Sequence, residues 1–281
     1  MKSVSVIGLG VMGSAVAYNF AINGHSVKAY NRTNKDFFKL TKSGVDIKST
    51  IAGAVKDAEI IIEVTADDES SKQMWLGPNG ILANGSKDAT YIAFATLSAR
   101  WVDELALKCK SQGLKFLDIP MTGGKVGADS GELTLLAGGD INVLENVKND
   151  LGSVSKEIKY FGKAGNGMRY KLILNALQAV HITALGEAIN IAKSVGLDQK
   201  IVGEALCERP GGVMTKLAWD GMVNAPKQAG FCVDWIAKDL RYANDLSDKT
   251  NHPYLLTAKD VYEDAIKKGN GKQDWTSVNR L

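Results

Sequence analysis

The first half of the chain alternates short apolar runs with stretches of helical pattern. Candidate strands lie at 3–7, 26–30, 60–64, 91–94 and 115–119, with two further runs at 133–137 and 157–161. Strands that alternate with helices are typical of βαβ units, in which crossover helices join parallel strands. Between the first two strands, residues 11–23 predict a helix, and Gly24 is placed as its left-handed stop. This half therefore predicts an α/β domain with a parallel sheet.

The second half has a different pattern. Residues 167–195 contain no proline, and apolar side chains fall around most of the helix circumference. Such a helix is buried between other elements, and it would be roughly 40 Å long. Gly196 then ends it, and Asp198 caps the next of several helices, with turns at 210–212, 225–230 and 251–253. We predict three parts: an α/β domain over 1–164, a long connecting helix over 165–195, and an all-α domain over 196–281.

Composition and charge exclude several classes of protein. The 281 residues are 45% hydrophobic and 23% charged, an ordinary mixture for a globular protein rather than a disordered or coiled-coil one. The 34 basic and 31 acidic residues are well mixed, so no nucleic-acid partner is expected. We find no signal-peptide pattern and only strand-length apolar runs, so we expect a cytoplasmic protein without membrane contact. The three cysteines and three histidines are scattered, which predicts neither disulfides nor a metal site.

Clustered glycines mark the first candidate binding loop. A GxGxxG set, formed by Gly8, Leu9, Gly10, Val11, Met12 and Gly13, lies between the first strand and its helix. It provides a tight turn, a bare backbone beside a pyrophosphate, and close packing of helix on strand. The amides at the helix N-terminus favour phosphate. A glycine-rich turn without a ligand is the plain alternative, but the flanking elements and spacing favour a Rossmann dinucleotide-binding domain.

The end of the second strand indicates which dinucleotide binds. An acidic residue there would hold the ribose hydroxyls of NAD, but the chain has Asn31, Arg32 and Thr33 instead. An arginine guanidinium binds phosphate through forked hydrogen bonds, and a threonine hydroxyl adds a donor. A solvated arginine in a loop is the alternative. The pattern favours NADP as the cofactor.

Two later segments supply candidate substrate chemistry. Thr122, Gly123 and Gly124 follow a predicted strand at the sheet edge where ligands bind, and they offer a hydroxyl and exposed amides for a carboxylate. Lys171 and Asn175 share one face of the long helix because they are four residues apart. Desolvation would lower the pKa of a lysine there and suit it to proton transfer, whereas the alternative is an ordinary surface lysine.

Four segments in this order resemble the β-hydroxyacid dehydrogenase family, which includes 3-hydroxyisobutyrate dehydrogenases and the glyoxylate, succinic semialdehyde and tartronate semialdehyde reductases. GLGVMGSAVAYNF resembles its cofactor fingerprint, DIPMTGGKVGADSGELT its substrate signature, and GKAGNGMRYKLILN its catalytic signature. The late segment FCVDWIAKDL matches a motif that reaches back to the cofactor. The resemblance covers nearly the whole chain.

The resemblance implies an NADPH-dependent enzyme in which hydride moves between the nicotinamide and a carbonyl carbon. It assigns Lys171 as the general acid and base, and Asn175 as a substrate contact, while Thr122, Gly123 and Gly124 would bind the substrate carboxylate. The residues that would touch the cofactor, beyond the glycine loop and residues 31–33, are Val64, Thr65, Ala66, Thr96 and Lys238. A homodimer or homotetramer is the family expectation.

Departures from the family pattern leave the substrate open. Thr122 stands where serine is usual, and Ala95 replaces a common serine. Arg209 could anchor the distal end of a substrate, although a solvated turn residue is the simpler interpretation. His181 could line the pocket, but a hydrogen-bonded core histidine is favoured over that role.

Two alternative functions are weighed against the reductase. One is an imine reductase on the same fold, which usually carries Asp or Tyr where Lys171 lies. The other is a non-catalytic NADP-binding protein, since related chromatin-associated members have lost this lysine. The presence of both Lys171 and Asn175 counts against each alternative.

Overall fold

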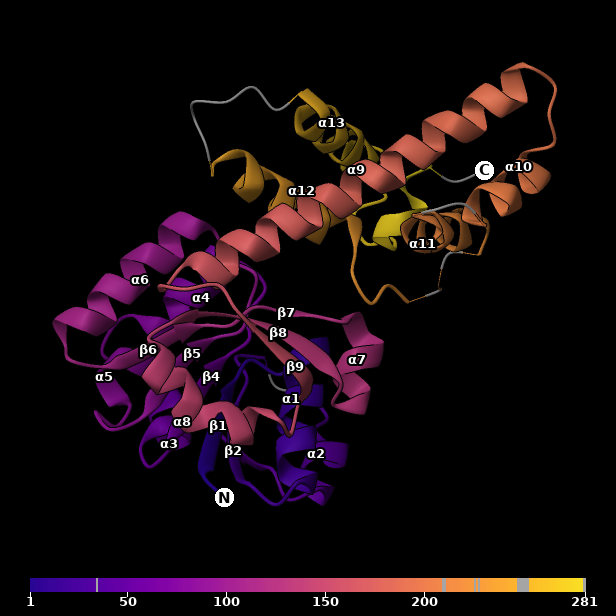
Figure 1. The fold of residues 1–281 in the computed structure, drawn as a ribbon. Helices are drawn as coiled ribbons and strands as arrows, with labels where there is room; N and C mark the ends of the chain where they lie inside the picture. The colour runs from indigo at the N-terminus through magenta and orange to yellow at the C-terminus, as the bar shows by residue number, and fades with distance from the viewer. Residues whose placement is uncertain (34, 209–210, 225, 227, 247–252, 280–281) are drawn as a thin grey trace. The chain divides into compact units, whose positions relative to one another are not determined.

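The computed structural model describes residues 1–33, 35–208, 211–224, 226, 228–246 and 253–279, and the chain divides into two compact units (Figure 1). Met1–Lys171 form an α/β unit, and Leu172–Leu281 form a helical unit. The predicted fold class is confirmed: a Rossmann-like unit, a long helix and a helical C-terminal region.

The α/β unit is built on a sheet of order β3-β2-β1-β4-β5-β6-β8-β7, with β9 paired to β8. Pairing is parallel from β3 to β6 and between β8 and β9, whereas β8 runs antiparallel to β6 and β7. The strands are β1 (Ser3–Ile7), β2 (Ser26–Tyr30), β3 (Asp46–Lys48), β4 (Ile60–Glu63), β5 (Thr90–Ala93), β6 (Lys115–Asp118), β7 (Met121–Thr122), β8 (Leu133–Gly139) and β9 (Ser155–Tyr160). All seven predicted strands are present, but β3 and β7 were missed because two or three residues make no apolar run.

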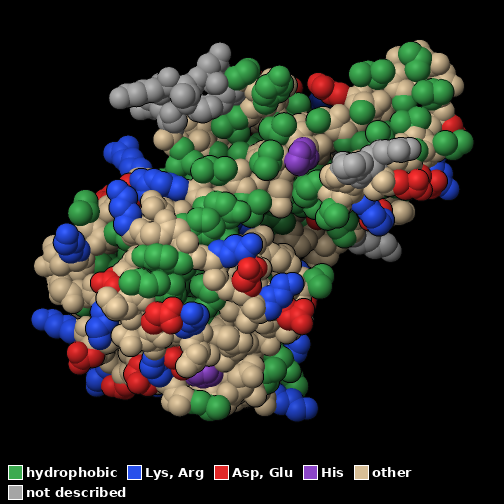
Figure 2. Space-filling model, in the orientation of Figure 1, with side chains coloured by type: hydrophobic (Ala, Val, Ile, Leu, Met, Phe, Trp, Pro, Cys, Tyr) green, Lys and Arg blue, Asp and Glu red, His purple; other side chains and the backbone are tan. Residues whose placement is uncertain are grey.

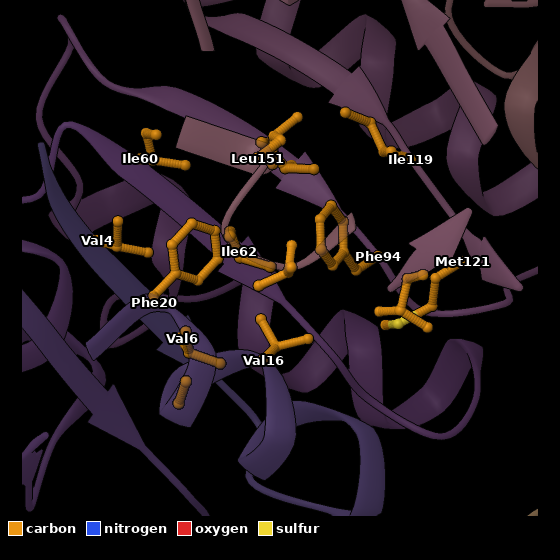
Figure 3. Close-up of a cluster of buried hydrophobic side chains, with 14 of the residues drawn as sticks. Val4, Val6, Val16, Phe20, Ile60, Ile62, Phe94, Ile119, Met121 and Leu151 are labelled. Carbon is orange, nitrogen blue, oxygen red and sulfur yellow. The ribbon is translucent and has the colours of Figure 1, made fainter. Parts of the chain in front are cut away.

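Helices flank this sheet: α1 (Val11–Ile22), α2 (Phe38–Lys42), α3 (Ile51–Val55), α4 (Asp68–Trp75), α5 (Ile81–Asn84), α6 (Ala99–Ser111), α7 (Gly124–Ser130) and α8 (Ile141–Leu151). Every residue of β4 and β5 is buried, as expected for parallel strands covered on both faces. Figure 3 shows the main core, where Ile62 of β4 and Phe94, just after β5, pack with Val16 and Phe20 of α1. Gly24 ends α1 with a φ of +87°, as predicted.

The long helix α9 (Asn166–Ser194) confirms the predicted helix to within one residue at each end. Gly196 follows with a φ of +80°, and Asp198 accepts a hydrogen bond from the Ile201 amide, as a helix cap does. The expectation of burial on all sides is wrong for the single chain, because Ile173, Leu177 and Ile191 are each more than half exposed.

By length and hydropathy alone, α9 also meets the criterion for a membrane-spanning helix, contrary to the expectation of only strand-length apolar runs. The central helix of a soluble protein meets the same criterion. Apolar residues of α9 belong to two cores of the helical unit: Ala179 to one, and Ile182, Leu185 and Ile189 to the other.

The rest of the helical unit consists of α10 (Gln199–Cys207), α11 (Gly212–Val223), α12 (Val233–Asn244), α13 (Pro253–Lys267) and the 3₁₀ helix η1 (Trp275–Asn279). Gly211 precedes α11 with a φ of +84°, in the turn predicted at 210–212. The turns predicted at 225–230 and 251–253 lie partly outside the described residues, and Arg209 lies wholly outside them.

Candidate active site

The GxGxxG loop joins β1 to α1, and close backbone contacts explain its glycines. Gly8 has a φ of +103°, and a Cβ on it would lie 2.3 Å from the Val64 carbonyl oxygen. A Cβ on Gly13 would lie 1.9 Å from the carbonyl oxygen of Gly8, so α1 can approach the strand only with glycine there. A Cβ on Gly10 would meet nothing within 4 Å. Gly8 and Gly13 are therefore required by packing, whereas Gly10 borders open space.

That open space suits a dinucleotide pyrophosphate. Gly10 is the N-cap of α1 and provides no side-chain cap, and no acidic residue occupies the first turn. The first amides of a helix need acceptors, and the helix dipole favours an anion beside them. The loop residues Gly8, Leu9, Gly10, Val11 and Met12 thus fit the phosphates of a nicotinamide dinucleotide.

Residues at the ends of β1, β2 and β4 are tied together at the carboxyl edge of the sheet. The Leu9 amide donates to Asn31 Oδ1 at 2.9 Å, and Asn31 Nδ2 donates to the Thr33 carbonyl at 2.7 Å. The Val64 amide donates to the Ile7 carbonyl at 2.8 Å. Thr65 and Ala66 continue from β4, and Thr96 follows β5. The cofactor residues predicted in this unit therefore follow neighbouring parallel strands.

Arg32 has a partner that the sequence analysis missed. Its Nη1 donates to Oε1 of Gln73 on α4 at 2.7 Å, and both side chains are exposed. Nothing local in the sequence signals this contact, because the two residues are 41 positions apart.

Glu63, the last residue of β4, is a second feature that the sequence analysis missed. The side chain is fully buried, and Oε1 accepts hydrogen bonds from the amide and hydroxyl of Thr65. Burial raises the pKa of Glu63 to about 7, although the Thr65 hydrogen bonds oppose the increase. Through these two hydrogen bonds, the carboxyl of Glu63 fixes the turn at residues 64–66 that follows β4.

The candidate substrate loop joins β7 to α7. Gly123 and Gly124 have φ values of +122° and +60°, which favour glycine, and a Cβ on Gly124 would meet nothing within 4 Å. Thr122 pairs with Thr134 of β8. The buried Asn19 of α1 donates from Nδ2 to the Ala128 carbonyl at 2.8 Å, so α7 is fixed to the helix of the glycine loop.

Asp118 ties the start of α9 to the end of β6. Its buried carboxylate accepts from the Gly165 amide at 2.7 Å and the Met168 amide at 2.8 Å. Burial raises the pKa of Asp118 to about 7, against the lowering effect of these two bonds. A Cβ on Gly167 would lie 2.2 Å from the Leu136 carbonyl oxygen, so glycine is required for the helix to approach β8. The sequence motif contained Asp118 but did not reveal this partner.

Lys171 lies one turn into α9, and it is partly buried. The turn before it is held by Arg169, whose two terminal nitrogens donate to both carboxylate oxygens of Asp103 on α6 at 2.9 and 2.6 Å. Arg169 therefore anchors the first turn of α9 to α6.

Asn175 and Lys238 lie in the helical unit, where Asp239 joins them. Nδ2 of the buried Asn175 donates to Asp239 Oδ2 at 2.6 Å, and Lys238 Nζ pairs with Asp239 Oδ1 at 2.9 Å. The Asp239 side chain is fully buried, so its charge is compensated by these two partners. Asp239 follows Lys238 in the late motif, but only the fold shows that it orients Asn175.

The remaining described candidates are His181 and possible metal ligands. His181 is exposed on α9, so its interpretation as a core histidine is wrong. Within the described ranges, no group of three or more His, Cys, Asp or Glu side chains could hold a metal ion.

Comparison with known proteins shows which family the chain resembles. The model for the NAD-binding domain of 6-phosphogluconate dehydrogenase matches residues 3–162, and the model for the NAD-binding domain of NADP-dependent 3-hydroxyisobutyrate dehydrogenase matches residues 165–281. An uncharacterised oxidoreductase of Synechocystis is 33% identical over 100% of this chain and 98% of its own length. The cytokine-like nuclear factor N-PAC of Xenopus tropicalis is 30% identical over 99% of the chain, which spans only 53% of that relative.

Solved structures share the fold. A 3-hydroxyisobutyrate dehydrogenase of Mycobacterium tuberculosis, solved with L-serine, has a TM-score of 0.86 at 24% identity, over 99% of this chain and 98% of its own. Psf3, solved with NADP⁺, has a TM-score of 0.88 at 20% identity, over 98% of each chain. An imine reductase of a Pseudomonas species has a TM-score of 0.64 at 20% identity, over 99% of this chain and 98% of its own. The two family models and the Synechocystis relative show that the chain belongs to the β-hydroxyacid dehydrogenase family, of the 3-hydroxyisobutyrate dehydrogenase type.

Proposed function

We propose that this protein is an NADPH-dependent reductase or dehydrogenase that interconverts small aldehydes and hydroxy acids bearing a carboxylate. The observation that carries the proposal is the bonding of Asp118. Its carboxylate holds the first turn of α9, which leads to Lys171, and its strand leads directly to Thr122. One buried group thereby supports both the lysine suited to proton transfer and the loop suited to carboxylate binding.

Different residues are assigned to cofactor binding and to proton transfer. The glycine loop and the turn at residues 64–66 hold the dinucleotide, together with Thr96 and Lys238, and Arg32 and Thr33 bind its 2′-phosphate. When bound, the nicotinamide supplies hydride to the carbonyl carbon or accepts it in the reverse direction. Lys171 protonates the carbonyl oxygen during reduction and removes the hydroxyl proton during oxidation.

Two sets of residues are assigned to the substrate. The Thr122 hydroxyl and the amides of Gly123 and Gly124 bind its carboxylate. The side-chain amide of Asn175 is fixed by Asp239, and it orients the substrate for proton transfer from Lys171. Hydrogen bonds between neutral donors and a carboxylate favour acidic substrates over uncharged aldehydes.

The protein is proposed to work in the cytoplasm as a homodimer or homotetramer. Figure 2 shows apolar side chains gathered over the helical unit, and several on α9 are exposed in the single chain. Exposed apolar surface of this kind is typical of a protein interface.

Oxidation of NADPH and NADH, at matched concentrations, tests the proposal with glyoxylate, succinic semialdehyde, tartronate semialdehyde and methylmalonate semialdehyde. Turnover of one of these with NADPH is expected, and the same aldehyde without its carboxylate serves as the matched control. A preference for NADH would contradict the role given to Arg32. Equal turnover of the control aldehyde would contradict the carboxylate site.

Two other outcomes point to the alternatives. The imine reductase structure shows that this fold also suits imine chemistry, and turnover of cyclic imines but not of the acids would favour that function. The N-PAC relatives raise the second alternative, a cofactor-binding protein without catalysis. Tight NADPH binding without turnover of any acid or imine would favour it.

A further inference from the structure

A chain of three exposed side chains links the end of β2 to α4. Arg32 Nη1 donates to Gln73 Oε1 at 2.7 Å, and Gln73 Nε2 donates to Glu69 Oε1 at 3.0 Å. Glu69 and Gln73 are four residues apart on α4, so they share one face of the helix. The result is a relay in the order Glu69, Gln73, Arg32.

The chemistry of the three groups allows only one orientation of the relay. A guanidinium can only donate hydrogen bonds, and a carboxylate can only accept them. The amide between them must direct its NH₂ group to Glu69 and its oxygen to Arg32. A flipped amide would place donor against donor and acceptor against acceptor. Glu69 therefore fixes which end of Gln73 meets the arginine.

The helix that carries Gln73 is firmly anchored. Asp67 and Ser70 form a reciprocal capping box at its N-terminus, and Asp68 accepts from the amide of Ser98 at 2.8 Å. Its inner face includes the fully buried Trp75. A side chain on such a helix holds its partner in a defined place, whereas a long arginine on a loop otherwise samples many rotamers.

Gln73 is uncharged, and this determines how Arg32 can still interact with a ligand. One hydrogen bond to Gln73 occupies one of the five N–H groups of Arg32 and leaves the others for a ligand. A carboxylate at position 73 would instead neutralise the guanidinium and compete with an anionic ligand. An amide thus positions the arginine without reducing its positive charge.

We propose that Gln73 is a positioning residue for recognition of the 2′-phosphate of NADPH. It holds Arg32 ready for that phosphate, and Glu69 fixes the orientation of the amide. This inference rests on the proposed function, because Arg32 must itself bind the 2′-phosphate.

The test compares ligands that differ only by that phosphate. Adenosine 2′,5′-bisphosphate and adenosine 5′-monophosphate are titrated by calorimetry into the wild type and into Gln73→Met, Gln73→Glu, Arg32→Ala and the Arg32→Ala/Gln73→Met double variant. No turnover is needed for this readout. Gln112→Met, which changes an exposed glutamine in the same unit, is the matched control.

For Gln73→Met we expect bisphosphate binding to weaken about fivefold, the usual effect of losing one hydrogen bond, with monophosphate binding unchanged. For Gln73→Glu we expect a larger loss, of about 20-fold, because the new carboxylate pairs with Arg32. In the Arg32→Ala background, Gln73→Met should have no further effect. The Gln112→Met control should bind both ligands like the wild type.

Three results would overturn the inference: no loss in Gln73→Met, an equal loss for both ligands, or the same loss without Arg32. Failure of the underlying function is distinguishable from these. If Arg32→Ala leaves the preference for the bisphosphate intact, the assignment of NADPH to Arg32 fails. If Arg32→Ala abolishes that preference while the Gln73 variants retain it, only the relay fails.

Discussion

The two units fix their candidate site residues by different means. In the α/β unit the backbone itself builds the site: Gly8 and Gly13 allow contacts that no side chain would permit, and Gly10 leaves open space. In the helical unit a side-chain network does so, in which Asp239 holds Asn175 and pairs with Lys238. The arrangement in the α/β unit can be recognised from the spacing of glycines in the sequence. The network in the helical unit forms only when its helices pack together.

The largest expected effect separates packing from binding within the glycine loop. Gly13→Ala should lower the free energy of unfolding by about 3 kcal/mol or more, because its Cβ would overlap the carbonyl of Gly8. Gly10→Ala should unfold like the wild type yet bind NADPH much more weakly. Urea denaturation and NADPH titration of both variants test this. A stable Gly13→Ala protein would contradict the backbone account of the α/β unit.

A second prediction concerns the buried carboxyls of the α/β unit. Because burial raises the pKa of Glu63 from 4.5 to about 7, its contribution to stability is fully present below pH 4.5 and is lost as the pH rises to about 7. The loss is on the order of 3 kcal/mol. Burial also raises the pKa of Asp118 to about 7, so its contribution to the free energy of unfolding is likewise lost as the pH rises.

Glu63→Gln removes the contribution of Glu63 alone. Urea denaturation between pH 4.5 and 8 should therefore show a shallower decline in the variant than in the wild type, with the remainder due to Asp118. Glu132→Gln, which changes an exposed carboxylate in the same unit, is the matched control. Identical slopes for the wild type and Glu63→Gln would show that Glu63 ionises freely in the folded protein.

The smallest expected effect tests the side-chain network of the helical unit. Asp239→Asn should raise the KM for the substrate about tenfold, because an amide no longer holds Asn175 and Lys238 as a carboxylate does. Asp260→Asn on α13, which changes an exposed carboxylate, is the control. An unchanged KM would remove Asp239 from the proposed site.

The sequence predicted what depends on local pattern. The strands, α1, α9 and the GxGxxG loop follow from periodicity and spacing, and the structure bears out the fold to within a few residues. The short strands β3 and β7 carry too few residues for a pattern, and they were missed.

Distant partners explain the features that the sequence could not predict. Gln73 meets Arg32 across 41 positions, Asp118 meets Gly165 across 47, and Asp239 meets Asn175 across 64. Likewise, the apolar residues of α9 predicted burial on all sides, but periodicity alone does not say which faces neighbouring helices cover. The exposed His181 was misjudged for the same reason.

The most direct test of the account is turnover by the Lys171→Ala variant. With saturating NADPH and the best carboxylate substrate, kcat should fall on the order of 1000-fold, the usual contribution of a positioned acid and base. The Kd for NADPH should stay within about twofold of the wild type, since the cofactor loop is built by other residues, and Lys193→Ala in the last turn of α9 should retain full activity. Undiminished turnover by Lys171→Ala would contradict the proposed mechanism.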